Sequence, residues 1–287
     1  MNRLSAERRT AVIKALVEGN SIRATCRLTG TAKGTVISLL VQIGEACQAF
    51  HDRTVRQIKA KRVQTDEIWS FTYSKERNVP EKKRGEAGDT WTWVGIDADT
   101  KLAISYLVAD RGPVSATAFM RDLASRLANR VQLTTDGYST YLPAVEKAFG
   151  WNGVDYARLV KVFKETGKEG RYSQGECIGA ERHWVMGNPV EADVSTSFVE
   201  RQNLTLRMQM RRFTRLTNAF SKKVQNHAYA VALHFAYYNC CRVHQTLTKR
   251  AGGIHQTPAM AAGLTDRVWT VGDLVALLDA NAVAASN

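Results

Sequence analysis

Residues 63–73 read VQTDEIWSFTY and alternate in polarity, which predicts a β-strand. Three aromatic residues fall on one side of this strand, and Asp66, Ile68 and Ser70 fall on the other. Aspartate is depleted in strands unless a site requires it. The stretch therefore predicts a sheet, and it marks Asp66 as a candidate functional carboxylate.

The segments after this strand predict the rest of an α/β domain. A polar, turn-rich loop precedes two further strands, which are joined by a tight turn at residues 97–99. Helix, strand, helix and strand then follow at residues 115–127, 131–137, 138–150 and 156–163. Three strands, then helix, strand, helix, strand and a long helix, are the element order of an RNase H-like domain. We therefore expect a mixed five-stranded sheet with flanking helices over residues 63–240.

The second half of this domain contains a predicted loop and a basic helix. Residues 164–195 show no periodicity and several glycines, which predicts a long surface loop inserted into the domain. The helical pattern returns at residues 195–215. There Glu200, Arg207 and Arg211 fall on one stripe, at intervals of seven and four residues. A carboxylate in line with arginines suits a phosphate-binding surface.

The two ends of the chain predict helical segments outside this domain. Residues 1–50 contain three short helical patterns separated by turns, which predicts an all-α helix-turn-helix domain, although any small three-helix bundle has the same pattern. Residues 51–62 are a basic, polar linker, and residues 241–287 form a tail with a short helix. The side chains expected to face DNA from the third helix are those of Thr31, Lys33 and Thr35.

Positive charge is concentrated in two parts of the chain. The formal net charge is +13. Residues 1–65 contain 12 Lys and Arg against 4 Asp and Glu, and residues 196–223 contain 7 against 1. These two parts account for a net +14, so the other residues together are close to neutral. Basic patches of this kind are typical of proteins that bind phosphate backbones.

Several classes of protein are disfavoured by the same sequence. The five cysteines form no C-x-x-C pair, which argues against a zinc finger or a disulfide framework. No apolar run is as long as a membrane span, and the first residues lack an apolar signal region. We therefore expect a cytoplasmic protein associated with the nucleoid.

Three acidic residues in separate motifs form a candidate catalytic set. They are Asp66, Asp136 in TTDGYSTY and Glu200 in FVERQNLTLR. Phosphodiester chemistry is often performed by two divalent ions about 3.5–4 Å apart, held by a few carboxylates. Each residue also has a plainer interpretation, because Asp-Gly is a common turn pair and a glutamate in a first helical turn complements the helix dipole. Asp97 ends a strand as well, but the tight turn that follows explains it adequately.

These motifs resemble the DDE transposases of bacterial and archaeal insertion sequences, closest to the insertion-sequence-one type. The resemblance rests on three motifs, spaced by 70 and 64 residues between their acidic members, and covers roughly residues 60–265. The motifs are Asp66-Glu67-Ile68-Trp69, Thr135-Asp136-Gly137-Tyr138 and Val199-Glu200-Arg201-Gln202-Asn203. The chain departs from many relatives in lacking a cysteine-paired zinc ribbon, and its interval from Asp136 to Glu200 is longer than in the shortest members.

The resemblance implies a transposase that binds the terminal inverted repeats of an element, nicks its ends and joins them to target DNA. Asp66, Asp136 and Glu200 would then be catalytic and would hold two Mg²⁺ (or Mn²⁺) ions. Arg207 and Arg211 would hold the double-stranded DNA backbone beside the site. His244 could also contact phosphate, although a capping or packing role explains it equally well. A homodimer or larger assembly on DNA is implied, because two ends must be processed together.

Two other functions remain compatible with the sequence. A transposase-derived transcriptional regulator would keep the DNA-binding helices without the chemistry, and the intact acidic set argues against it. A metal-dependent endonuclease would cut DNA through the same domain without strand transfer.

Overall fold

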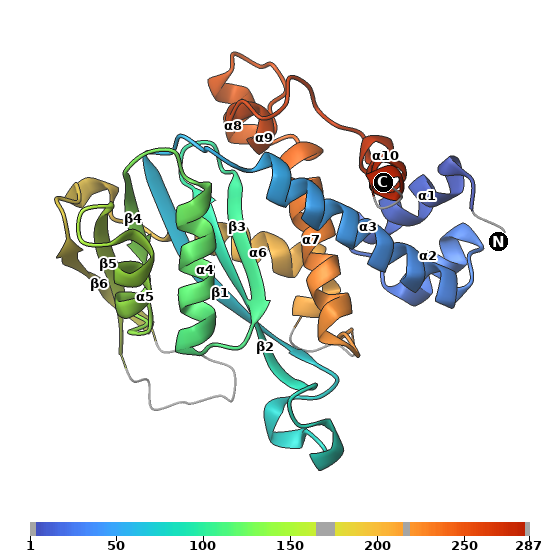
Figure 1. Ribbon diagram of the computed structural model, residues 1–287, viewed down its shortest axis with the longest axis horizontal. Coiled ribbons are helices and arrows are strands. Elements are labelled where there is room, and N and C mark those ends of the chain that lie inside the picture. Colours follow the sequence, from blue (N-terminus) through green and yellow to red (C-terminus); the bar gives the residue numbers. More distant parts are fainter. Residues whose placement is uncertain (1–3, 165–175, 215–218, 285–287) are drawn as a thin grey trace.

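The computed structural model describes residues 4–164, 176–214 and 219–284 (Figure 1). A mixed six-stranded sheet with the strand order β3-β2-β1-β4-β5-β6 lies in this part of the chain. The strands are β1 (Arg62–Thr72), β2 (Gly88–Asp97), β3 (Ala103–Ala109), β4 (Val131–Thr135), β5 (Val154–Lys164) and β6 (Glu176–Met186). The first three pair antiparallel, β4 and β5 run parallel to β1, and β6 returns antiparallel to β5. This α/β arrangement is consistent with an RNase H-like fold.

Helices cover both faces of the sheet. The alternation of β2 and β3 sends Trp93 and Ile104 into one core and their neighbours Val94 and Ala103 into the other. The first core contains α4 (Pro113–Arg126) and α5 (Tyr141–Phe149), which lie in front of the sheet in Figure 1. The second contains α6 (Ser197–Gln209) and α7 (Val224–Cys240). Residues on one strand therefore face two different environments.

Three helices form at the N-terminus where the sequence predicts them. They are α1 (Ala6–Val17), α2 (Ile22–Thr29) and α3 (Lys33–Thr54). Ser5 and Ser21 accept hydrogen bonds from backbone N–H groups in the first turns of α1 and α2, as their cap positions predict. Gly30 ends α2 with a φ of 61°, which glycine adopts without steric cost.

The third helix extends beyond its predicted end. It contains residues 51–54 of the predicted linker, and β1 begins at Arg62, so the connection is shorter than expected. A Cβ added at Gly44 would lie 2.3 Å from the Cβ of Tyr229, so α3 and α7 approach each other closely at this glycine. Side chains of α1, α3 and α7 share one core with the sheet. The division of the chain into separate domains stays a prediction.

The predicted loop at 164–195 is partly wrong, because β6 lies within it and gives the sheet a sixth strand instead of five. Described residues of β6 up to Val185 are exposed, so this edge strand has no buried face and no apolar alternation to reveal it. The remainder of the predicted loop at residues 165–175 lies outside the described residues. Short 3-10 turns occur at Glu76–Asn78, Glu81–Lys83, Glu191–Asp193 and Arg211–Phe213.

The C-terminal part contains α8 (Gln245–Arg250), α9 (Pro258–Ala261) and α10 (Val271–Ala284). Leu274 and Val275 of α10 are buried in the core that contains α1 and α3. Across the described segments, no helix combines the length and the apolar character needed to cross a bilayer.

Candidate functional site: an acidic cluster beside the central strands

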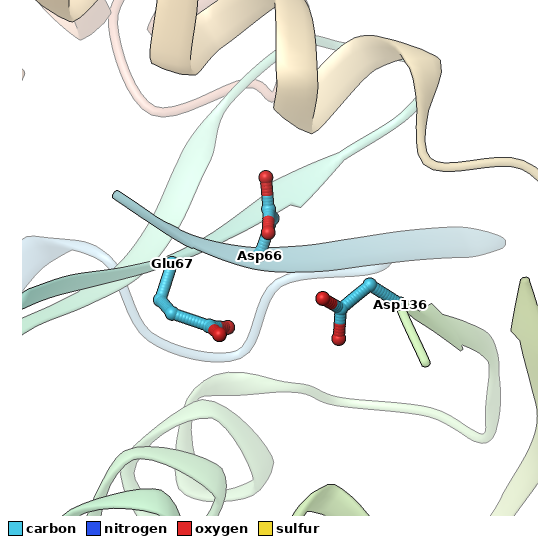
Figure 2. Close-up of side chains that lie close together, drawn as sticks. All are labelled: Asp66, Glu67 and Asp136. Carbon is cyan, nitrogen blue, oxygen red and sulfur yellow. The ribbon is translucent and has the colours of Figure 1, made fainter. Parts of the chain in front are cut away.

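The pairing of β1 with β4 brings two of the predicted carboxylates together. In this parallel pair Arg62 lies opposite Gln132 and Gln64 opposite Thr134, an offset of 70 residues (132 − 62). The same offset places Asp66 level with Asp136, which follows the last residue of β4. Carboxylate oxygens of Asp66, Glu67 and Asp136 lie within 4.8 Å of one another (Figure 2). The spacing of two motifs in the sequence therefore becomes proximity in space.

Glu67 is the member of this cluster that sequence reasoning missed. Strand alternation sends Asp66 towards α6, where Asn203 donates a hydrogen bond of 2.8 Å to its Oδ2. Glu67 points to the opposite face, where the Tyr141 hydroxyl of α5 donates to its Oε2 at 2.8 Å. Figure 2 shows the two side chains leaving opposite sides of β1 and Asp136 approaching from β4. The available signal was its position directly beside Asp66 in the first motif.

An arginine compensates the charge of Glu67. Arg111 donates from Nε to Oε1 of Glu67 at 2.7 Å, and its Nη2 lies 2.5 Å from the same oxygen. The guanidinium also lies over the rings of Trp91 and Tyr138, at 4.4 and 4.1 Å from their centroids. Glu67 is only 7% exposed, so its carboxylate is largely removed from water, whereas the Arg111 side chain is 38% exposed. Glu67 is therefore positioned to hold Arg111 beside the cluster.

The electrostatics of the cluster favour bound protons or a cation. Burial, together with the charges of Glu67 and Asp136, raises the pKa of Asp66 to about 7. Burial also raises the pKa of Glu67 and the pKa of Asp136; hydrogen bonds from Tyr141 and from the Tyr138 backbone oppose these two increases. Three carboxylates held this close repel one another, and a divalent cation between them would relieve that repulsion.

The donor set fits a hard divalent metal ion. Every candidate ligand atom is a carboxylate oxygen, which suits Mg²⁺ or Mn²⁺ better than a soft metal. Asp66 and Asp136 are the better ligands, because Glu67 is already engaged with Arg111 and Tyr141. Asp97 lies outside the cluster. Its carboxylate accepts hydrogen bonds from the Asp99 backbone and the Thr100 hydroxyl, as expected of a turn residue.

Glu200, the third predicted ligand, lies near the cluster but is engaged elsewhere. It sits in the first turn of α6, where Lys161 donates to its Oε2 at 2.6 Å and Thr196 to its Oε1 at 2.5 Å. Asn203, one helical turn further along α6, contacts Asp66 directly. The charge of Glu200 contributes to raising the pKa of Asp136, after the larger effect of burial. A metal-binding role for Glu200 stays a prediction.

No protein-family model and no curated protein matches the sequence. Among solved structures, the Mos1 transposase paired-end complex with the left transposon end is 12% identical and covers 54% of this chain, with a TM-score of 0.25. The Mos1 strand transfer complex is also 12% identical and covers 54% of this chain, with a TM-score of 0.24. The matches span 59% and 58% of those two chains. At this level of likeness the function must be inferred from the geometry of the site itself.

The exposure predicted for Thr31 and the helical stripe predicted for Arg211 are wrong, whereas DNA contact by either residue stays a prediction. Thr31 is 5% exposed and its hydroxyl donates to the Thr29 carbonyl, so it does not face solvent. The helix that begins at Ser197 ends at Gln209, because Met210 adopts an extended conformation (φ −122°, ψ 104°). Arg211 therefore lies in a 3-10 turn and does not continue the stripe of Glu200 and Arg207.

The other predicted contact residues lie on the surface or near it. Lys33 and Thr35 are exposed in the first turn of α3, and Arg207 is partly exposed on α6. His244 precedes α8 and is half-buried; burial and then the nearby cations Lys101, Arg242 and Arg250 lower its pKa. A role in phosphate binding remains a prediction for each of them.

Proposed function

We propose that this protein is a metal-dependent DNA transposase that binds the ends of a mobile element, nicks them and joins them to target DNA. The observation that carries the proposal is the cluster of Asp66, Glu67 and Asp136 in a chain of net charge +13. Carboxylates with raised pKa values, gathered beside central strands, suit a site for divalent metal ions. The surrounding positive charge suits a polyanionic substrate.

The chain would contribute the ligands and their orientation. Asp66 and Asp136 would hold Mg²⁺ or Mn²⁺, and Glu200 would join them after leaving Lys161. When bound, two such ions would activate the attacking hydroxyl or water and stabilise the leaving oxygen. Asn203 fixes one oxygen of Asp66 from α6. The backbone N–H of Tyr138 donates to Oδ1 of Asp136 at 2.9 Å and fixes that carboxylate.

Arg111 would act beside these ligands on the phosphate. Glu67 and the two aromatic rings hold its guanidinium close to Asp136, where its charge lowers the pKa of that carboxyl. A guanidinium fixed by stacking loses little rotamer freedom when it meets a phosphate. Lys33, Thr35, Arg207, Arg211 and His244 would contact the DNA backbone further from the cluster. A homodimer or larger assembly would bring two ends together.

Carboxylate removal tests the proposal. We expect Asp66→Ala and Asp136→Ala to lose nicking and joining of element ends while retaining DNA binding in a gel-shift assay. Glu86→Ala is a matched control, because it removes an exposed carboxylate paired with Lys83 in the loop between β1 and β2. Activity of Asp66→Ala together with inactivity of Asp97→Ala would contradict the assignment. Nicking without joining, measured on pre-cut ends, would indicate an endonuclease instead.

A further inference from the structure

A large basic groove lies between the N-terminal helices and the end of α6. Its volume is about 860 Å³, and it is bordered by the turn from α1 to α2, the first turns of α3, residues 209–212, residues 219–222 and part of α7. Figure 1 shows α1 and α2 on the opposite side of α7 from the sheet. Pockets that bury a whole small ligand occupy roughly 300–1,000 Å³. The groove therefore has room for more than a single phosphate group.

Five cations from four segments line the groove. They are Arg23, Lys33, Arg211, Arg212 and Lys222, and no lining residue is acidic. Within residues 4–164, 176–214 and 219–284, none of the five forms an ion pair with a carboxylate. Like charges gathered without counter-ions repel one another, so the groove is suited to an anion with several charges.

Arg212 shows most clearly that the groove cations lack a carboxylate counter-ion within the described part of the chain. Its guanidinium donates to the Ser221 hydroxyl, and burial lowers its pKa to about 10. A carboxylate partner would raise the pKa, as Asp99 does for Arg62. Nearby, His234 is 4% exposed, and its Nε2 has no hydrogen-bond partner. His234 is thus a polar side chain of the groove that is held away from water without full compensation.

The floor of the groove is apolar. Ile37, Leu40, Met210 and Leu233 line it together with the cations. A lining that combines cations with apolar side chains matches a DNA backbone, whose phosphates are charged and whose sugars are largely apolar. An inorganic anion would use only the cations and would leave the apolar floor unmatched.

The position of the groove relates it to the acidic cluster. Asn203 of α6 contacts Asp66, and Gln209, six residues later, borders the groove. Six residues of α-helix rise about 9 Å, so α6 leads from the acidic cluster to the border of the groove. Gly19 fixes this placement: its φ is +79°, and a Cβ there would lie 2.8 Å from the Gln209 carbonyl oxygen.

We propose that this groove, defined by Arg23, Lys33, Arg211, Arg212 and Lys222, binds the phosphate backbone of the DNA beside the position cut at the acidic cluster. The inference rests on the proposed function for the identity of the DNA. It adds Arg23, Arg212 and Lys222 to the expected contacts, and it makes the N-terminal helices and the end of α6 one binding surface.

The test uses exposed groove cations. Arg212 is not substituted, because Arg212→Gln removes a partly buried group and can disturb the segment around it. Arg23→Gln/Lys222→Gln replaces two exposed groove residues. Arg121→Gln/Lys147→Gln replaces two exposed residues of α4 and α5, on the other face of the sheet, with the same change in charge. Full-length proteins are compared by salt-titrated anisotropy with element-end duplexes in metal-free buffer, after thermal melting has shown that each variant is folded.

Each lost phosphate contact reduces the magnitude of the slope of log K, the DNA association constant, against log salt concentration by about 0.9. The groove double variant should therefore have a slope smaller by about 1.8, whereas the control double variant should keep the wild-type slope. Phosphate-ethylation interference should lose its signal at a discrete set of phosphates in the groove variant alone. Equal slopes and equal interference patterns in both double variants would overturn the proposal. So would binding of inorganic phosphate that depends on Arg23 and Lys222 while duplex binding does not.

Binding in metal-free buffer separates this proposal from the proposed chemistry. A groove variant that shows the slope change and the loss of interference signal, together with a wild-type protein that never cuts DNA, supports the groove and contradicts the transposase assignment. A protein that cuts at the acidic cluster with an unchanged groove-variant slope supports the chemistry and overturns the groove.

Discussion

Neutralising Asp66 should stabilise the folded protein when no metal is bound. The pKa of Asp66 is raised from 3.8 to about 7, so the folded state binds more protons than the unfolded state between these values. Stability therefore falls as the pH rises through this range and stays low above it. Asp66→Asn removes the ionisation but retains an oxygen that can accept the hydrogen bond from Asn203.

The magnitude follows from the same pKa. One pKa unit corresponds to about 1.4 kcal/mol. The raised pKa of Asp66 therefore limits the stabilisation of the folded state by Asp66→Asn to about 4 kcal/mol at pH 8. Because protonation of Asp66, Glu67 and Asp136 is coupled, neutralising Asp66 also changes the protonation of the other two carboxyls. We therefore expect Asp66→Asn to stabilise the folded state by about 1–3 kcal/mol. Mg²⁺ at one hundred times its dissociation constant should add about 2.7 kcal/mol to the wild type at pH 8, and much less to the variant.

Urea unfolding from pH 5 to pH 8, with EDTA or with Mg²⁺, measures these differences. Asp97→Asn is the matched comparison, because burial also raises the pKa of Asp97 but its carboxylate accepts two hydrogen bonds within its own turn. That variant should be destabilised by about 1–3 kcal/mol. An Asp66→Asn protein that is less stable than the wild type at pH 8 in EDTA, or that keeps the wild-type dependence on pH, would refute the electrostatic account of the cluster.

Three other changes test separate parts of the structure. Glu67→Gln should reduce nicking without reducing DNA binding, because it removes the carboxylate charge that holds Arg111 beside the cluster. Lys161→Met should free Glu200, so half-maximal nicking should need less Mg²⁺ than in the wild type; an unchanged requirement would argue against Glu200 as a ligand. Gly44→Ala should cost about 1–3 kcal/mol in thermal or urea unfolding because of the contact with Tyr229. Gly34→Ala on the same helix meets nothing within 4 Å and should be neutral or stabilising by up to about 1 kcal/mol.

Local patterns in the sequence predict the sheet and part of the site. The alternation of residues 63–73 identifies β1, and the caps at Ser5 and Ser21 identify the first two helices. The 70-residue interval between Asp66 and Asp136 equals the offset of the β1–β4 pair. These features depend on neighbours along the chain or on a single strand pairing, so they can be predicted from the sequence.

Features that depend on tertiary packing cannot be predicted from local sequence patterns. Glu67 alternates to the opposite face from Asp66, so nothing in β1 alone shows that Tyr141 and Arg111 hold it near Asp136. The break at Met210 has no glycine or proline to mark it, and it removes Arg211 from the predicted stripe. Arg212 does not belong to the predicted stripe, and only the packing of residues 219–222 against it shows that it lies in the basic groove.

The acidic cluster and the basic groove have complementary roles because of their opposite charges. Two unit charges about 5 Å apart interact by about 3 kcal/mol at an effective dielectric constant of 20, so ionised Asp66 and Asp136 repel a phosphate that approaches without a cation. The cluster therefore cannot itself retain DNA before metal binds. The groove cations lie on α2, on α3 and in the segments after α6, and they attract the same DNA without pairing with the carboxylates. Binding and cleavage should consequently respond to different residues, even though a single helix, α6, positions both through Asn203 and Gln209.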